Sequence, residues 1–366
     1  LGKNALCVHL TYVPYLAAAG ELKTKPTQHS VKELQSVGIQ PDILVLRTEH
    51  ELSTNLKKKV ALFCNVDDNA VVQSMDMPTI YEVPLRMQEQ KLDVTILEKM
   101  GLPVGETPTL GPWKAFLERR QKATEKVKIG LVGKYDLQDA YKSILEALSQ
   151  AATYNDRKAD IHFINSEKLT EENIEESLKD MDGIIICPGF GQRGIEGKFT
   201  AIKYCRTHNV PTFGICLGMQ CMAIEFARDV LGYTDANSRE MDEKTPHNVI
   251  DIMEEQKSIT NMGGTMRLGA YECVLDPNSK VYQAYQSEHI QERHRHRYEF
   301  NNDYKAEFEA AGMKCVGINP DSDLVEIIEI PTLKWFIGTQ FHPEYSSTVL
   351  KPHPLFLSFI KAAIDK

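Results

Sequence analysis

The chain has 366 residues, of which 42% are hydrophobic and 25% charged, a composition typical of a water-soluble globular protein with room for two cores. The net charge of −9 argues against nucleic acid as the main partner, and no run of eighteen apolar residues indicates a membrane span. The eight cysteines form no C-x-x-C pair, so we predict no metal site, no disulfide framework and a cytoplasmic location.

The first hundred residues alternate strand and helix patterns, which predicts an α/β domain over residues 1–100. The predicted strands cover residues 5–13, 42–47 and 70–73, and the predicted helices cover 30–37 and 54–63. The chain starts without Met and enters a strand within its first residues, so we expect a missing piece upstream.

A basic segment, Lys23-Thr-Lys-Pro-Thr-Gln28, precedes the helix predicted at 30–37. Lysines supply point charges and a helix N-terminus supplies free N–H groups, so this segment is a candidate anion cradle. A solvated basic loop is the alternative. The run Lys57–Lys59 by itself indicates a solvated helix face.

Proline and glycine cluster after residue 101 and are followed by a charged helical stretch, which predicts a linker over residues 101–126. From residue 127 to 366, strands and helices alternate, which predicts a second domain with a parallel, doubly wound sheet. Its predicted strands cover 127–132, 159–164, 183–187, 210–215 and 335–339, and its predicted helices 140–152, 170–179, 197–208, 219–230 and 356–364.

Cys216 lies between a predicted strand and a predicted helix, in Gly214-Ile-Cys-Leu-Gly218. A sharp strand-to-helix turn lifts a side chain out of the backbone, and the start of the helix favours a thiolate there. A buried structural cysteine is the alternative, and it is the better interpretation unless a base lies nearby. We therefore expect an exposed nucleophile at an elbow if the chain supplies that base.

A base is available in Gln340-Phe-His-Pro-Glu344, which follows the last predicted strand. Residues two apart in an extended chain project to the same side, so Glu344 can orient His342 as a general base. A lone His-x-Glu pair is usually structural, but together with Cys216 it indicates a nucleophile–base–acid triad.

Three further segments carry candidate site residues. Pro188–Gly194 is a glycine-rich turn that can present N–H groups to an oxyanion, although such turns usually only reverse the chain. Asn237–Glu240 can supply a carboxylate for an ammonium group, or it is a surface loop. In Arg293-His-Arg-His-Arg297, strand alternation places the arginines on one face and the histidines on the other.

The Cys216, His342 and Glu344 motifs resemble those of the class I glutamine amidotransferases, which implies a flavodoxin-like, doubly wound domain and a cysteine glutaminase. At the turn, the family commonly has Pro-Gly-Gly-Phe-Gly, whereas this chain has Cys187-Pro-Gly-Phe-Gly, so only Gly189 is carried over. The resemblance implies that L-glutamine is bound by Gly189, Leu217, Gly218, Met219, Gln220, Glu240 and Arg297.

The first domain resembles the second half of the synthase domain of the CTP synthase family, a P-loop-type fold. The resemblance rests on Lys23–Gln28 with the following His-Ser-Val-Lys-Glu-Leu, on Phe63-Cys-Asn-Val and on Ile80-Tyr-Glu-Val-Pro. It implies amination of UTP to CTP with ATP and Mg²⁺, whose binding residues have no counterpart in this chain. It also implies a UTP and CTP site at Lys23, Thr24, Lys25, Pro26, Thr27, Gln28 and Lys59.

The same resemblance implies activation by GTP, associated with Gly263–Gly269, and a homotetramer that can form filaments. Three alternatives remain at this point. The chain could be a stand-alone thiol hydrolase such as a γ-glutamyl hydrolase, which leaves the first domain unexplained. It could be an inactive binding module, which the intact triad disfavours, or a structural assembly protein.

Overall fold

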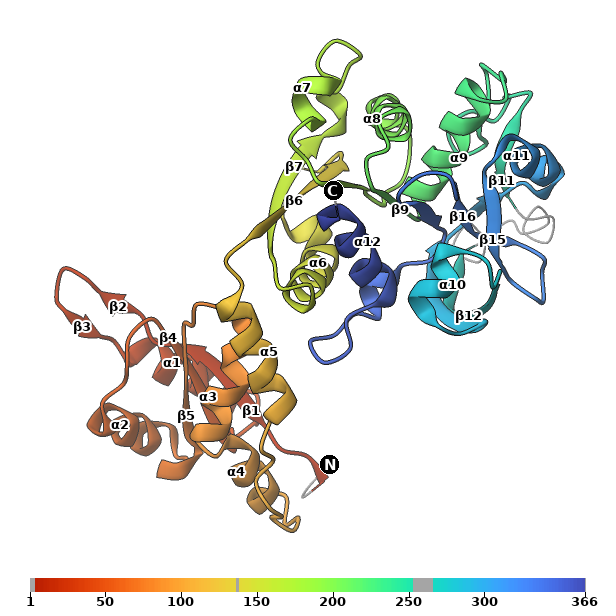
Figure 1. The fold of residues 1–366 in the computed structure, drawn as a ribbon. Coiled ribbons are helices and arrows are strands. Elements are labelled where there is room, and N and C mark those ends of the chain that lie inside the picture. Colours follow the sequence, from red (N-terminus) through yellow and green to blue (C-terminus); the bar gives the residue numbers. More distant parts are fainter. Residues whose placement is uncertain (1–3, 136–137, 253–265, 366) are drawn as a thin grey trace. The chain divides into compact units, whose positions relative to one another are not determined.

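The computed structural model describes residues 4–135, 138–252 and 266–365 (Figure 1). The chain divides into two compact units, Leu1–Leu117 and Glu118–Lys366. The division falls inside helix α5 (Gly111–Lys122). The limits 1–100, 101–126 and 127–366 stay a prediction.

The first unit is built on a three-stranded parallel sheet in the order β1-β4-β5. The central strand is buried along almost its whole length because it carries the apolar run Ile43–Leu46. Helices pack on this sheet through Val31 and Val60. The elements are β1 (Val8–Tyr12), β2 (Tyr15–Leu16), β3 (Glu21–Leu22), α1 (Lys25–Ser36), β4 (Ile43–Thr48), α2 (Thr54–Cys64), β5 (Val71–Met75), α3 (Val83–Glu89), α4 (Leu92–Lys99) and the start of α5.

The second unit contains a nine-stranded sheet in the order β13-β12-β15-β16-β17-β9-β8-β6-β7. A separate small sheet has the order β10-β11-β14. The strands are β6 (Lys126–Gly133), β7 (Lys158–Asn165), β8 (Gly183–Ile186), β9 (Thr212–Ile215), β10 (Asn237–Ser238), β11 (Asn248–Ile252), β12 (Arg267–Leu275), β13 (His289–His296), β14 (Tyr298–Phe300), β15 (Lys314–Ile318), β16 (Val325–Glu329) and β17 (Phe336–Thr339). The helices are α6 (Lys142–Tyr154), α7 (Ile174–Leu178), α8 (Ile195–Thr207), α9 (Leu217–Asp229), α10 (Lys280–Tyr285), α11 (Lys305–Ala311) and α12 (Pro354–Ile364).

The sheet is mixed, whereas the sequence predicted a parallel one. The five strands from β17 to β7 are parallel, and the pairings from β13 to β17 are antiparallel. The reason is connection length: β16 is joined to its neighbours by the short segments 319–324 and 330–335. Antiparallel strands accept such turns, whereas a parallel crossover needs a dozen or more residues.

Both faces of the large sheet are covered, as Figure 1 shows for the second unit by itself. Along β8, Ile184 and Ile186 join the core under α8 and α9, while Ile185 joins the core under α6 and α12. This alternation follows from the period of two in a strand. The sheet therefore holds the ends of β9 and β17 rigidly at its centre.

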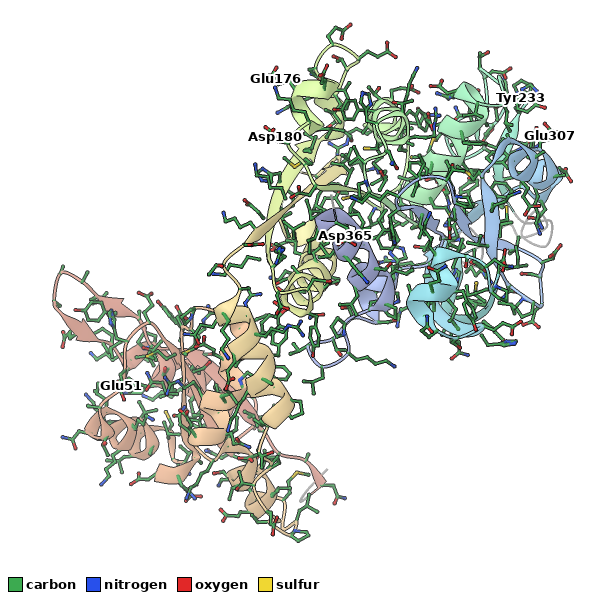
Figure 2. The ribbon with its side chains drawn as sticks, in the orientation of Figure 1. Glu51, Glu176, Asp180, Tyr233, Glu307 and Asp365 are labelled. Atoms are coloured by element: carbon green, nitrogen blue, oxygen red, sulfur yellow. The ribbon has the colours of Figure 1, made fainter. Side chains whose placement is uncertain are left out.

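Helix α7 is shorter than the predicted helix 170–179. Its first residues form a turn instead, in which the Thr170 N–H donates to Asn173 Oδ1 at 2.9 Å. Asn favours such local bonds over a helix. At the surface, Figure 2 shows Tyr233, whose hydroxyl donates to Glu307 Oε2 at 2.5 Å and links the segment after α9 to α11.

Candidate functional site

The turn at Cys216 joins β9 directly to α9, as the sequence predicted. Cys216 has φ 53° and ψ −107°, a region that non-glycine residues rarely adopt. A Cβ on Gly218 would lie 2.1 Å from the Ile186 carbonyl oxygen, and one on Gly214 would lie 2.3 Å from Met222 Sδ. Both glycines are therefore required by the close packing of helix on sheet.

Cys216 is only 3% exposed, so the expectation of an exposed nucleophile is wrong. The elbow lifts the side chain out of the backbone, but the side chain is then buried in the core on the face of the sheet that α6 and α12 cover. It reaches a cavity there rather than bulk solvent. Burial and nucleophilic geometry are thus combined at this residue, where the sequence analysis treated them as alternatives.

The strand β17 brings His342 to the elbow. It pairs in parallel with β9, with Thr339 opposite Ile215, and the Cys216 N–H donates to the Thr339 carbonyl at 2.7 Å. The His342 N–H donates to the Arg293 carbonyl at 2.9 Å, which fixes the loop after β17 on β13. His342 is therefore held by backbone contacts on two strands.

His342 Nδ1 lies 2.7 Å from Glu344 Oε1, so the predicted pair forms. The predicted geometry is wrong, however, because Pro343–Tyr345 form a 3-10 turn and the chain is not extended there. Burial lowers the pKa of His342, but hydrogen bonds with Cys216 and Glu344 and the charges of both outweigh burial and raise it to about 11. The environment therefore favours an imidazolium at His342.

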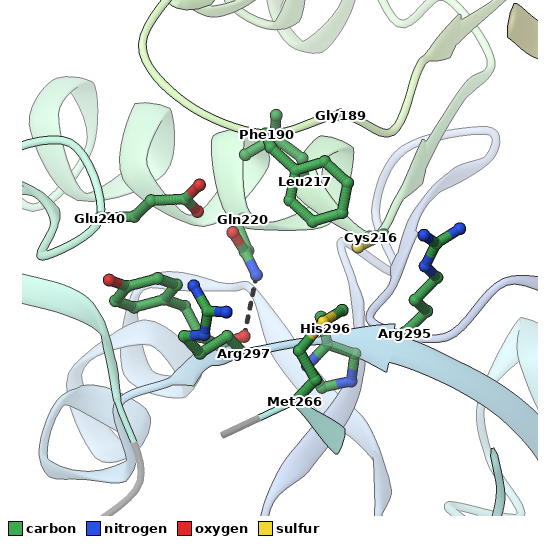
Figure 3. A pocket seen from close by; sticks show the side chains of 11 residues that line it. Gly189, Phe190, Cys216, Leu217, Gln220, Glu240, Met266, Arg295, His296 and Arg297 are labelled. Carbon is green, nitrogen blue, oxygen red and sulfur yellow. Dashed lines mark hydrogen bonds between the residues drawn. The ribbon is translucent and has the colours of Figure 1, made fainter. Parts of the chain in front are cut away.

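A cavity of about 160 Å³ opens beside the sulfur (Figure 3). An apolar cavity of about 150 Å³ takes up a benzene-sized molecule, so this one suits a small substrate. Its lining joins the elbow, the turn after β8, the small sheet and the end of β13. The lining residues are Gly189, Phe190, Cys216, Leu217, Gln220, Glu240, Met266, Arg295, His296, Arg297 and Tyr298.

Six predicted residues thus share one cavity: Gly189, Cys216, Leu217, Gln220, Glu240 and Arg297. Gly218 and Met219 are not among its lining residues; both are buried in the first turn of α9. Sequence reasoning missed Phe190, Met266, Arg295, His296 and Tyr298. The alternating pattern of 293–297 was a usable signal for two of these, since it predicted a strand with opposite faces.

The turn after β8 is held from several sides. The Gly191 N–H donates to Glu240 Oε1 at 2.9 Å, and Lys134 Nζ donates to the Phe190 carbonyl. From within the core, Lys198 Nζ donates to the Cys187 carbonyl at 2.6 Å. Lys198 is 1% exposed, and burial lowers the pKa of its ammonium group. These contacts position Gly189 at the cavity wall.

The predicted alternation along 293–297 is confirmed for β13. Arg293 and Arg295 are exposed, and His294 and His296 are buried. Arg297 follows the end of the strand and lines the cavity. Figure 3 shows Arg297 and Glu240 on the same side of the cavity, at a distance from Cys216.

The two histidines belong to a buried charged cluster with Arg267, Glu299 and Glu326, which we call the polar cluster. Its members are the five residues Arg267, His294, His296, Glu299 and Glu326, all less than a tenth exposed. Arg267 Nη1 lies 2.5 Å from Glu326 Oε1 and 3.6 Å from Glu299 Oε1. His294 Nδ1 and His296 Nε2 are 2.7 Å apart.

Burial dominates the titration of this polar cluster. Burial and the charge of Arg267 lower the pKa of His294 to about 3, and burial and His294 hold that of His296 well below its usual range. Burial raises the pKa of Glu326 to about 7, against the pull of Arg267. Burial and Glu326 raise the pKa of Glu299 well above its usual range. Both imidazoles are therefore neutral.

In the first unit, the predicted nucleotide segment lies across the start of α1. Thr24 is the N-cap, and Lys25 and Pro26 are exposed in the first turn. Thr27 is fully buried, with its Oγ1 3.0 Å from Thr11 Oγ1, so it packs rather than faces outward. Gln28 Nε2 donates to Thr24 Oγ1 at 3.2 Å.

The lysines of this region differ in their contacts. Lys23 pairs with Glu21, and Lys59 is exposed on α2. Lys57, which the sequence analysis assigned to a solvated face, donates to Gln90 Oε1 at 3.1 Å, and burial lowers the pKa of its ammonium group. The solvated-face interpretation is therefore wrong for Lys57.

The predicted loop Gly263–Gly269 is described only in part. Residues 263–265 lie outside the described residues. Arg267, Leu268 and Gly269 belong to β12 rather than to a flexible turn, because they pair with His296, Arg295 and His294. Arg267 is moreover buried in the polar cluster.

Sequence comparisons identify both units. The family described as "Glutamine amidotransferase class-I" matches residues 136–362, and "CTP synthase N-terminus" matches residues 1–102. The CTP synthase of Bacteroides thetaiotaomicron is 81% identical over 367 residues, which cover 100% of this chain and 68% of that protein. The chain belongs to the CTP synthase family. A more distant CTP synthase, from Porphyromonas gingivalis, is 62% identical over 365 residues and is covered to 68%.

The second unit also resembles a solved member of the CTP synthase family. The Trypanosoma brucei CTPS glutaminase domain with bound acivicin superposes with a TM-score of 0.63 at 37% identity, covering 66% of this chain and 95% of that one. The fold is thus that of a class I glutamine amidotransferase with a large mixed sheet. Across the parts that the structure describes, no helix is both long and apolar enough to span a membrane.

Proposed function

We propose that the second unit hydrolyses L-glutamine to glutamate and ammonia for CTP synthesis, with Cys216, His342 and Glu344 as its triad. The observation that carries this is one connected arrangement. Glu344 Oε1 lies 2.7 Å from His342 Nδ1, Cys216 and Glu344 together raise the pKa of His342, and Cys216 lines a cavity that also contains a carboxylate and a guanidinium.

The first half of the reaction forms a thioester. The Cys216 thiolate attacks the carbon of the side-chain amide, and a C–S bond forms as the C–O double bond becomes an oxyanion. Backbone N–H groups at Gly189 and Leu217 face this oxyanion, one from the turn after β8 and one from the start of α9. The C–N bond then breaks as the His342 imidazolium gives its proton to the leaving nitrogen, which departs as ammonia.

The second half restores the enzyme. Neutral His342 takes a proton from a water molecule, whose oxygen attacks the thioester carbon. The C–S bond breaks, glutamate leaves, and the Cys216 thiolate again faces an imidazolium. Glu344 keeps Nδ1 of His342 protonated throughout, so that Nε2 is the atom that exchanges protons.

The far side of the cavity suits the amino-acid end of glutamine. Arg297 presents a guanidinium, which matches the planar α-carboxylate, and Glu240 presents a carboxylate to the α-ammonium. Glu240 Oε1 already accepts the Gly191 N–H, which leaves Oε2 for the substrate. Gln220 lies between these groups and the elbow, while Gly218 and Met219 act through the backbone of α9.

For the synthase half, we propose that ammonia attacks UTP activated by ATP, in keeping with the family. The support in this chain is the segment Lys23–Gln28 at the N-terminus of α1, with Lys59 on α2, as part of a UTP and CTP site. The described residues contain no group of three or more His, Cys, Asp or Glu side chains that could hold a metal ion. The use of ATP and Mg²⁺ is therefore proposed from the family alone.

Regulation, assembly and location are proposed on the family alone, with one supporting observation. We expect activation by GTP through the segment around Gly263–Gly269, and a homotetramer capable of forming filaments. All eight cysteines are free, which suits the reducing cytoplasm.

The decisive experiment measures ammonia released from glutamine by the chain and by its Cys216→Ala variant. The chain should release ammonia and the variant should not, and acivicin should inhibit the chain because it binds the Trypanosoma brucei domain. Retained activity in the variant would remove Cys216 from the mechanism. The γ-glutamyl hydrolase alternative is not favoured, since the match to "CTP synthase N-terminus" over residues 1–102 explains the first unit.

A further inference from the structure

The side-chain amide of Gln340, a residue that the proposed mechanism does not use, lies close to the sulfur of Cys216. Gln340 follows β17, is fully buried, and its Nε2 lies 3.8 Å from Cys216 Sγ. Its backbone is fixed as well, because the Gln340 N–H donates to the Glu326 carbonyl at 2.8 Å. Gln340 therefore approaches Cys216 from the loop that also carries His342.

The orientation of this amide is decided by a chain of hydrogen bonds that ends at a backbone carbonyl. Gln220 Nε2 donates to the Tyr298 carbonyl at 2.9 Å and to Gln340 Oε1 at 3.2 Å. A carbonyl oxygen only accepts, so the nitrogen of Gln220 has to face it. The second hydrogen of that nitrogen then faces Gln340, whose oxygen has to accept it.

The consequence falls on Cys216. With its oxygen engaged by Gln220, Gln340 has only its NH₂ group to turn toward the sulfur, and an NH₂ group donates and does not accept. A thiolate accepts such a bond, whereas a neutral thiol gains far less from it. The fixed Tyr298 carbonyl thus sets the orientation of the Gln220 amide, and Gln220 sets that of Gln340. As a result, the NH₂ group of Gln340 faces the sulfur of Cys216.

We propose that Gln340 is a further catalytic residue, whose amide donates to the Cys216 thiolate, and that Gln220 is a positioning residue that sets the direction of this amide. The proposal rests on the proposed role of Cys216 as nucleophile. His342 and Gln340 then approach the sulfur as two separate donors. Because Gln220 also lines the cavity, a ligand that moves Gln220 changes the reactivity of the sulfur.

The test measures the reactivity of the thiolate without glutamine. Iodoacetamide is small enough for the cavity, and its rate of reaction with Cys216, followed by peptide mass, gives the pH midpoint of thiolate formation. Gln340→Met keeps the volume and removes the donor. We expect the midpoint to rise by about one unit, which is about tenfold slower alkylation below it. An unchanged midpoint would overturn the role of Gln340.

A second variant tests the orientation. In Gln220→Glu, the carboxylate accepts from Gln340 Nε2, which turns the oxygen of Gln340 onto the sulfur and raises the midpoint although residue 220 does not touch the sulfur. The new charge contributes too, so the same change is made in the Gln340→Met background. We expect Gln220→Glu to raise the pH midpoint of alkylation clearly more when Gln340 is present than in the Gln340→Met background. Equal rises in both backgrounds would show that Gln220 does not orient Gln340.

The same assay separates this proposal from the proposed function. If Cys216 of the unchanged protein reacts no faster than the buried Cys205, the nucleophile itself is misassigned. If Cys216 reacts fast and Gln340→Met does not change its midpoint, the triad stands and only the role of Gln340 fails. Thermal unfolding of each variant verifies that it is folded, and Gln340→Leu replaces Gln340→Met if the latter is not.

Discussion

His342 Nδ1 and Glu344 Oε1 are 2.7 Å apart although only Pro343 separates the two residues. A 3-10 turn over Pro343–Tyr345 achieves this, because it curls the chain and brings the carboxylate back to the ring. Glu344 Oε2 accepts no hydrogen bond from the described residues, so the carboxylate is devoted to His342. This hydrogen bond therefore fixes the orientation of the His342 ring, and the charge of Glu344 favours the protonated ring.

This pair gives stability a definite dependence on pH. The folded pKa of His342, about 11, lies above its ordinary value of 6.5, so the ring binds its proton more tightly in the folded state. Its contribution is fully present below pH 6.5 and is lost as the pH rises toward 11. We expect the difference in unfolding free energy between the protein and His342→Gln to shrink over this window.

Urea unfolding at pH 6.5, 8 and 9.5 measures this difference. Glu344→Gln is the matched control, because it keeps the contact with Cys216 and removes one of the charges that raise the pKa of His342. In Glu344→Gln, the pKa of His342 should be lower than in the unchanged protein. The stabilising contribution of the protonated His342 ring should therefore be lost at a lower pH. A difference that stays constant between pH 8 and 9.5 would mean that His342 is neutral in the folded protein.

Backbone strain at Cys216 predicts a conflict between stability and activity. Its φ of 53° with ψ of −107° costs a non-glycine residue about 1–3 kcal/mol. Cys216→Ala and Cys216→Gly should both lack glutaminase activity, but the glycine variant should unfold at a higher urea concentration than the alanine variant. Equal midpoints would show that the turn relaxes at no cost.

Glu240 and Arg297 are expected to bind the two ends of the amino-acid group. Arg297→Ala should raise KM for glutamine at least about tenfold, since a lost charged contact costs about 1.5–3 kcal/mol. Steady-state kinetics of ammonia release provide the values. An unchanged KM would place Arg297 outside the substrate site.

Glu240 allows its two contacts to be separated. Glu240→Gln keeps an oxygen for the Gly191 N–H but loses the charge, so KM should rise with kcat largely kept. Glu240→Ala also frees the turn after β8, so kcat should fall as well. If both variants changed kcat equally, the contact with Gly191 would have no part in holding Gly189.

The polar cluster predicts one shared proton. The contact between His294 Nδ1 and His296 Nε2 takes one of the two ring protons of a neutral pair, so their outer nitrogens carry only one proton. These outer nitrogens lie 3.5 Å from Glu326 Oε2 and 3.3 Å from Glu299 Oε1. A bare nitrogen beside a carboxylate is repulsive, so one of the two glutamates has to be protonated.

The amide of Gln resembles a protonated carboxyl group in shape and charge. Substitution by Gln therefore tests how many of the two glutamates are protonated. Glu299→Gln and Glu326→Gln should each cost at most about 1 kcal/mol, whereas the double variant leaves the buried charge of Arg267 unpaired and should cost about 3–5 kcal/mol. Urea unfolding at pH 7 measures all three. Additive losses would mean that both glutamates are ionised.

The sequence predicted the triad because each member lies in a local pattern. Cys216 has its glycines, and His342 and Glu344 share one short segment after a strand. The burial of Cys216 was not predictable, since Cys216 packs in the core under α6 and α12, whose residues lie far from it in the sequence. Likewise Gln340 and Arg267 gain their roles from strands that pair far from them in sequence, and neither has a local pattern that reports it.

The mixed sheet was missed for a related reason. Alternation of strands and helices indicates parallel pairing, and it held from β6 to β9 and again at β17. Beyond that point, the short segments 319–324 and 330–335 reverse the chain. Their length was visible, but no strand was predicted for residues 314–329, so these segments were not recognised as turns between neighbouring strands.

The hydrogen bond from the Cys216 N–H to the Thr339 carbonyl also ties catalysis to the order of folding. The elbow and the loop after β17 lie more than a hundred residues apart, since Gln340 and Cys216 are 124 positions apart, and they meet only when β17 docks beside β9. Contacts of such long range form late and together, because the loop that they close is large. During refolding, the circular dichroism signal of the helices can therefore return before glutaminase activity does. The time at which ammonia release returns therefore reports when β17 pairs with β9.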